Sequence, residues 1–78
     1  MKIGDLILWK QDTLRAFLVP SAEVDEYSKH IGLIFEERIR DGKEVFRIIW
    51  VVASGGESYI EEVFKADIDN WFDVISKS

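Results

Sequence analysis

Few side chains in this sequence are arranged for chemistry. His30 is the only histidine and the chain has no cysteine, so the usual ligands of a zinc site and a Cys–His nucleophile are both missing. No serine or threonine lies in a recognisable nucleophile turn. We therefore expect His30 to be a structural residue at the start of a strand. The chain is not expected to be an enzyme, and no metal or cofactor is expected.

Carboxylates and glycines give no stronger signal. Adjacent glutamates occur at residues 36–37 and 61–62, but neighbouring residues in a strand point to opposite faces, so neither pair can act jointly as acid and base. Residues 67–70 resemble part of a calcium loop without its glycine and its distal glutamate. Residues 55–56, Gly-Gly, lack the phosphate-binding pattern and a following helix, so they predict a turn.

Composition indicates one small domain over residues 1–78, with 47% apolar residues to form a core. Without cysteine, packing alone must stabilise the fold. The N-terminus does not resemble a signal peptide and no apolar run is long enough for a membrane helix, so we expect a cytoplasmic protein without membrane contact. The net charge is −5, of which −4 lies in residues 57–78. Duplex DNA is therefore not an expected partner, because binding to phosphates needs clustered lysine and arginine.

Short apolar runs separated by turn residues predict strands rather than helices. The expected strands are residues 6–9, 30–40, 44–52, 58–63 and 71–76. The third is rich in β-branched and aromatic residues and is expected in the middle of the sheet.

The connections complete the plan. Asp41 and Gly42, between two β-prone runs, predict a tight hairpin. Residues 10–29 are expected to be a long mobile loop, with at most one helical turn near Ser21, and residues 53–57 a second turn. Residues 65–70 predict a short helical turn before the last strand. This order predicts an all-β fold, a small five-stranded SH3-like barrel.

Several short motifs resemble the small SH3-like barrel proteins encoded by tailed bacteriophages. The shared pieces are an opening Gly-Asp-Leu strand with Trp-Lys at residues 4–10, apolar-Gly-apolar at residues 31–34, apolar-Trp at residues 49–50, and the ending at residues 73–76. The likeness covers nearly the whole chain except residues 11–29. Many of these phage proteins have no known function, so the likeness implies a phage accessory protein in the cytoplasm of the host cell. Because no catalytic motif is present, we expect a small non-catalytic binding or assembly module.

Two other relatives fit less well. Proline-motif SH3 modules resemble one another in an Ala-Leu-Tyr-Asp-Tyr segment, which residues 1–29 do not reproduce. Ribosomal and transcription KOW modules are similar in using a strand glycine like Gly32, but they tend to be basic. A nucleic-acid-binding module of this SH3-like or KOW type, stacking bases on Trp9, Trp50 and Tyr59, is the alternative function.

The aromatic residues are the best candidates for a binding surface. The chain has three tryptophans, two tyrosines and five phenylalanines. A fully buried ring hides roughly 150–250 Å², so a small barrel is not expected to enclose them all. The candidate surface residues are Trp9, Phe46, Trp50, Tyr59 and Trp71.

The third strand adds a related expectation, because both of its faces are apolar. Phe46, Ile48, Trp50 and Val52 share one face, and Val45, Arg47, Ile49 and Val51 share the other. One face fills the core, so the other needs a cover. That cover is the chain's own loop with Phe17 and Val19, a second copy in a homo-oligomer, or another protein.

Overall fold

The computed structural model of the chain describes residues 1–17, 21–52 and 56–77. The elements in chain order are β1 (Leu6–Trp9), α1 (Gln11–Phe17), α2 (Ser21–Tyr27), β2 (Ile31–Arg40), β3 (Lys43–Val51), β4 (Tyr59–Phe64), α3 (Lys65–Trp71) and β5 (Phe72–Ser76). Each predicted strand agrees with an observed strand to within one residue at either end. The second predicted turn falls largely on residues 53–55, which lie outside the described residues.

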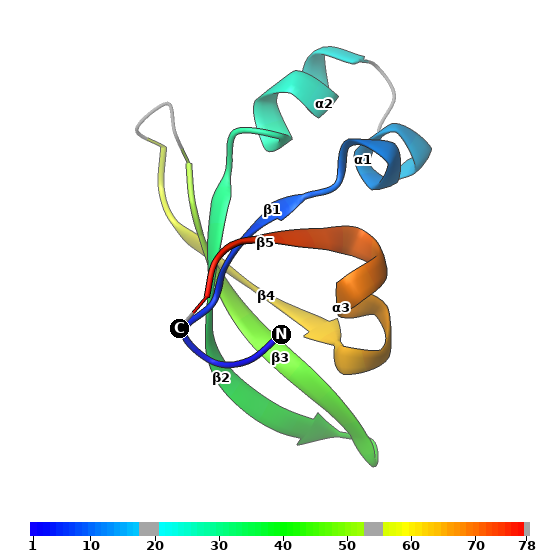
Figure 1. Ribbon diagram of the computed structural model, residues 1–78, viewed down its shortest axis with the longest axis vertical. Coiled ribbons are helices and arrows are strands. Elements are labelled where there is room, and N and C mark those ends of the chain that lie inside the picture. The colour runs from blue at the N-terminus through cyan, green and yellow to red at the C-terminus, as the bar shows by residue number, and fades with distance from the viewer. Residues whose placement is uncertain (18–20, 53–55, 78) are drawn as a thin grey trace.

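The fold is mostly β, with five antiparallel strands in one sheet of order β4-β3-β2-β1-β5. The middle strand is therefore β2, and the prediction that residues 44–52 form the middle is wrong by one place. Among the strands described, β4 and β5 are the two edges and do not pair with each other, so the sheet is open. Figure 1 shows the long β2–β3 hairpin projecting from one end, and α3 connecting the two edge strands.

The turn of this hairpin forms for the reason that the sequence indicates. Asp41 and Gly42 have φ values of 52° and 76°, and positive φ at both central residues is the requirement of a type I′ turn. Its backbone twist matches the twist of the flanking strands, so Arg40 pairs directly with Lys43. The predicted hairpin at Asp41 and Gly42 is confirmed.

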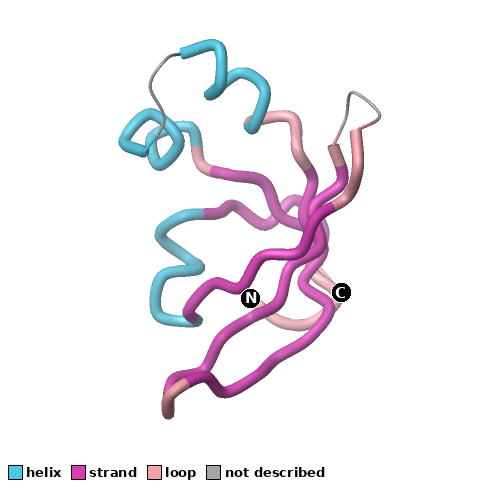
Figure 2. The backbone as a smooth tube through the Cα atoms, turned by 180° about the vertical axis from the view of Figure 1, so that it is seen from behind, coloured by secondary structure: helices cyan, strands magenta, loops and turns pink. Residues whose placement is uncertain are grey.

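Residues 10–29 differ from the predicted loop, because they contain α1 and α2. Each helix has seven residues, and in the described parts each buries one apolar side chain, Leu14 or Val24. Such short helices carry no repeated apolar stripe, which is why the sequence pattern did not reveal them. α1 is attached to α3 by Thr13, whose hydroxyl donates to the carbonyl of Asn70 at 3.2 Å. Figure 2 shows both helices beyond one end of the strands.

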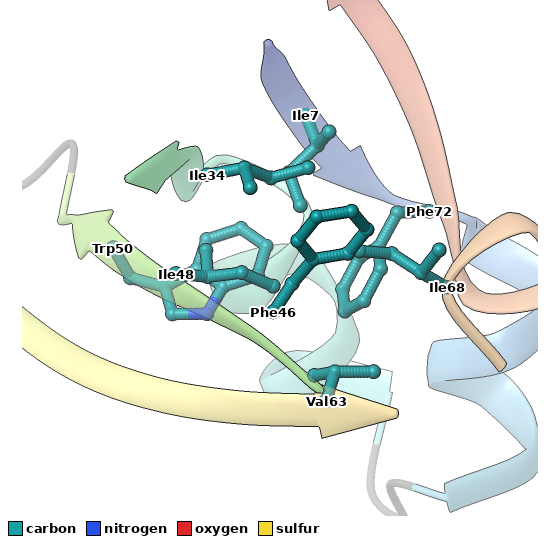
Figure 3. Close-up of a cluster of buried hydrophobic side chains, with 8 residues drawn as sticks. All are labelled: Ile7, Ile34, Phe46, Ile48, Trp50, Val63, Ile68 and Phe72. Atoms are coloured by element: carbon teal, nitrogen blue, oxygen red, sulfur yellow. The ribbon is translucent and has the colours of Figure 1, made fainter. Parts of the chain in front are cut away.

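The core lies on one face of the sheet, which we call the inner face. It is the face of β3 that carries Phe46, Ile48 and Trp50, and the opposite face is the outer face. The buried core residues are Ile7, Ile34, Phe46, Ile48, Trp50, Val63, Ile68 and Phe72 (Figure 3). Ile68 of α3 belongs to this cluster, so α3 covers the inner face. No helix in the described part of the chain is long and apolar enough to cross a membrane.

Gly32 of β2 makes room for the largest core side chain. It pairs with Trp50 across the sheet, and a Cβ placed on Gly32 would lie 2.8 Å from Ile48 Cγ2 and 2.9 Å from Trp50 Cζ3. Contacts that short require the indole or the strand to move. The apolar-Gly-apolar motif at residues 31–34 is therefore a packing requirement of Trp50.

Gly32→Ala is accordingly expected to destabilise the protein by about 1–3 kcal/mol, as overpacking in a dense core does. The matched control is Gly56→Ala, since Gly56 is exposed and its added Cβ would lie 3.2 Å from one side-chain atom of Val52. Urea unfolding followed by tryptophan fluorescence measures both. Equal stability of the two variants would contradict the packing role of Gly32.

Candidate docking surface

An aromatic row crosses the inner side of the sheet and connects it to the helices. Its members, in spatial order, are Phe17, Trp71, Trp9, Trp50, Tyr59, His30 and Tyr27. The ring centroids of successive members lie 4.9 to 6.4 Å apart. At the centre, Trp9 and Trp50 stack with their planes only 11° apart. Phe17 and Tyr27 at its ends belong to α1 and α2, so the row packs both helices against the sheet.

The predicted surface residues lie in or beside this row, and two of them are core. Trp50 is 0% and Phe46 2% exposed, so the prediction that they form a binding surface is wrong. Trp9, Tyr59 and Trp71 are partly buried and pack against the core. Base stacking on Trp50 would require the core to open. Neighbouring rings in the row bury part of one another's surface. A small fold can therefore hold more rings than it could if each had to be buried separately and completely.

Polar groups in the row connect α2 to β4. His30 is buried just before β2, and its Nδ1 lies 3.0 Å from the Tyr59 hydroxyl. Its Nε2 lies 3.7 Å from a carboxylate oxygen of Glu26, one turn earlier. Burial, with a smaller contribution from the nearby Glu61 charge, raises the pKa of Tyr59 to about 12. Tyr59 therefore stays protonated at neutral pH. The position of His30 next to the first residue of β2 agrees with the predicted position at the start of a strand.

The structure gives little support for a small-molecule or metal site. Within residues 1–17, 21–52 and 56–77, no group of three or more His, Asp and Glu side chains is placed to hold a metal ion. A surface cavity of about 570 Å³ lies between the hairpin tip and α3. Its lining includes Lys43 and Lys65 but also Glu44 and Asp67. These charges balance, so the lining does not favour a ligand of either charge.

The outer face carries a continuous set of aliphatic side chains, which we call the outer patch. Register places Leu6 opposite Leu33, Leu33 opposite Ile49 and Ile49 opposite Ile60, in one row across four strands. A second, shorter row pairs Ile31 with Val51. Ile31, Val51 and Ile60 are 42%, 54% and 52% exposed. Isolated apolar side chains are common on protein surfaces, but a contiguous patch marks an interaction site.

The predicted cover by the chain's own loop is absent among the described residues. Phe17 contacts Trp71 in the aromatic row, on the side of the sheet away from the outer patch, while Val19 lies outside the described residues. Figure 1 shows α1 and α3 on one side of the strands. Sequence reasoning identified Val45, Ile49 and Val51 as one of two possible outer sets. Val45 is only 3% exposed, so the prediction that it belongs to a contact surface is wrong. Sequence reasoning missed Leu33 and Ile60, and the alternation within residues 31–33 and 58–63 is the signal that could have found them.

A chain of ion pairs borders the outer patch where β2, β3 and β4 continue towards the hairpin. Arg47 Nη1 lies 3.0 Å from Glu36, and Arg47 Nε lies 3.7 Å from Glu62. Arg38 contacts the other oxygen of Glu36 at 2.7 Å, and Arg40 contacts Glu62 at 3.2 Å. The Arg38 guanidinium, with help from Arg47 and against partial desolvation, holds the pKa of the Glu36 carboxyl below its usual value. We call these five side chains the ion-pair border.

Glu61 is a carboxylate on the inner face of the sheet. Glu61 lies opposite Ile48 and Glu62 opposite Arg47, so the two carboxylates point to opposite faces, as predicted. Glu61 is half-buried between the inward-facing Tyr59 and Val63, and burial raises the pKa of its carboxyl above the usual 4.5. A raised pKa means that the folded state holds the proton more tightly than the unfolded state, so ionisation of Glu61 opposes folding.

Glu61→Gln is therefore expected to raise the melting temperature at pH 7. The advantage should shrink as the pH falls through the range in which the glutamate titrates, and vanish below the unfolded-state pKa, where both forms are neutral. Thermal unfolding by circular dichroism from pH 3 to pH 8 measures it. The control is Glu57→Gln, because Glu57 is exposed. A constant difference across this pH range would show that burial of the charge is not the cause.

No protein-family model matches the chain, and neither does any curated protein or solved structure. The outer patch, its ion-pair border and the aromatic row are therefore the features from which a function has to be inferred.

Proposed function

We propose that the protein is a small non-catalytic binding or assembly module that docks another protein chain on the outer patch. The observation that carries this proposal is the exposure of Ile31, Val51 and Ile60 in register with partly buried neighbours on four strands. Regular sheet holds these side chains rigidly, so a partner would meet a surface that is already formed. Little conformational entropy is then lost on binding.

The resemblance to phage-encoded SH3-like proteins agrees with this proposal. The tight β2–β3 hairpin and the short helix α3 between β4 and β5 support an SH3-like arrangement. On this interpretation the protein is a phage accessory protein that works in the host cytoplasm. The acidic composition supports a protein partner over nucleic acid, because phosphate binding needs unpaired cations and the arginines beside the outer patch are paired with glutamates.

A charged residue in the outer patch is expected to abolish docking while leaving the fold intact. Ile60→Glu places a carboxylate at a half-exposed position, where burial against a partner would desolvate it. The matched control is Ile39→Glu, since Ile39 is 72% exposed near the hairpin tip and pairs with Glu44, a position off the outer face.

The measurement is mild purification of each tagged protein from the cells in which it naturally occurs, followed by size analysis and chemical cross-linking. Wild type and Ile39→Glu should elute in an assembly larger than one chain, and Ile60→Glu should elute alone. Identical complexes with all three proteins would contradict the assignment of the docking surface.

A further inference from the structure

We infer that the occupant of the outer patch is a second copy of this chain, packed face to face about a two-fold axis. The inference rests on the proposed function, because it names the partner of the same surface. Two observations favour a second copy over a different protein, namely the distribution of charge and the pattern of the ion-pair border, and the size of the face then sets the strength of the contact.

Charge is the first observation. The chain carries −5, but the ion-pair border has three arginines and two glutamates and so sums to +1. The remainder of the molecule therefore carries −6. Two copies repel each other in most orientations, and this repulsion is weakest when their outer faces meet. A strongly basic partner would instead be attracted to the acidic surfaces elsewhere.

The pattern of the border is the second observation. Along the border the signs alternate, in the order Arg38, Glu36, Arg47, Glu62 and Arg40. A two-fold axis places the same surface on both sides, so that when residue i meets residue j, j also meets i. An alternating series can be set against its own copy with arginines facing glutamates. A border whose charges all had the same sign could not pair with its own copy in this way.

The size of the face sets the strength of the contact. The ten residues of β2 extend roughly 33 Å, and three strand spacings from β1 to β4 add about 14 Å in the other direction. The face thus offers roughly 450 Å² of flat area, to which projecting side chains add. A standard interface takes about 800 Å² from each partner. The dimer is therefore a reversible one that depends on concentration.

Sedimentation equilibrium of the purified protein alone, from low micromolar to near-millimolar concentration, is the first test. Wild type and Ile39→Glu should fit a monomer–dimer equilibrium with dissociation constants within about twofold of each other. Ile60→Glu should weaken the dimer by at least about tenfold, because the contact would bury an unpaired carboxylate. Val51→Glu is a second variant on the same face, in case Ile60→Glu is poorly folded by circular dichroism.

Single cysteines locate the contact, since the natural chain has none. Val51→Cys should form a disulfide-linked dimer or react with a short bismaleimide, at a rate that rises with protein concentration. Adding Ile60→Glu to that chain should suppress the product. The control is Asp69→Cys, at an exposed position on α3. Equal cross-linking from both cysteines would place the contact elsewhere and overturn the inference.

The two proposals fail in different ways. If the purified wild type stays monomeric at all concentrations, the second-copy inference is wrong. If, in addition, Ile60→Glu still loses a complex that wild type forms in its own cells, the outer patch docks a different protein and the proposed function stands. If wild type is alone in both settings, both proposals fail.

Discussion

The contact between Trp50 and Gly32 is the constraint on which the rest of the structure depends. The indole lies over a residue without a side chain, and this lets the largest core group reach the inner face of two adjacent strands. Trp9 then stacks on Trp50, Trp71 stacks on Trp9, and Phe17 of α1 packs on Trp71. On the other side Tyr59 leads to His30 and Tyr27, and thus to α2. One tight approach of side chain to backbone therefore positions both N-terminal helices.

Because the aromatic row lies on the inner side, the outer patch consists of aliphatic side chains. Phe46, Ile48 and Trp50 fill the core, so the intervening Ile49 and Val51 must point the other way. Their neighbours in register are also aliphatic, which makes the outer patch continuous across strands. Where Arg47 replaces an aliphatic residue in this alternation, glutamates on both neighbouring strands pair with it. The alternation of residues along β3 therefore determines where the outer patch ends and the ion-pair border begins.

Much of the fold was predictable from local signals. Asp41 and Gly42 specify their turn by backbone conformation alone, and period-two runs located the five strands. The helices were not predictable, because Leu14 and Val24 are single anchors whose value depends on distant partners. The alternation of apolar residues along β3 also predicted two possible outer faces but did not distinguish between them. The choice depends on Gly32, which leaves room for the Trp50 side chain on one side of β3. The pairing of these two residues is a long-range property of two strands.

The open edges of the sheet have a consequence for how copies of this protein can assemble. An edge strand offers unpaired backbone groups to any other strand, and unlimited edge pairing produces fibrils. Here the edge strands β4 and β5 have only six and five residues, and short edge strands limit such pairing. Ribbon-like growth is thereby disfavoured. In the proposed dimer, association through the outer face about a two-fold axis would end at two chains, because the outer face of each copy is then occupied. The short edges would thus help the proposed dimer to remain a closed assembly instead of an open polymer.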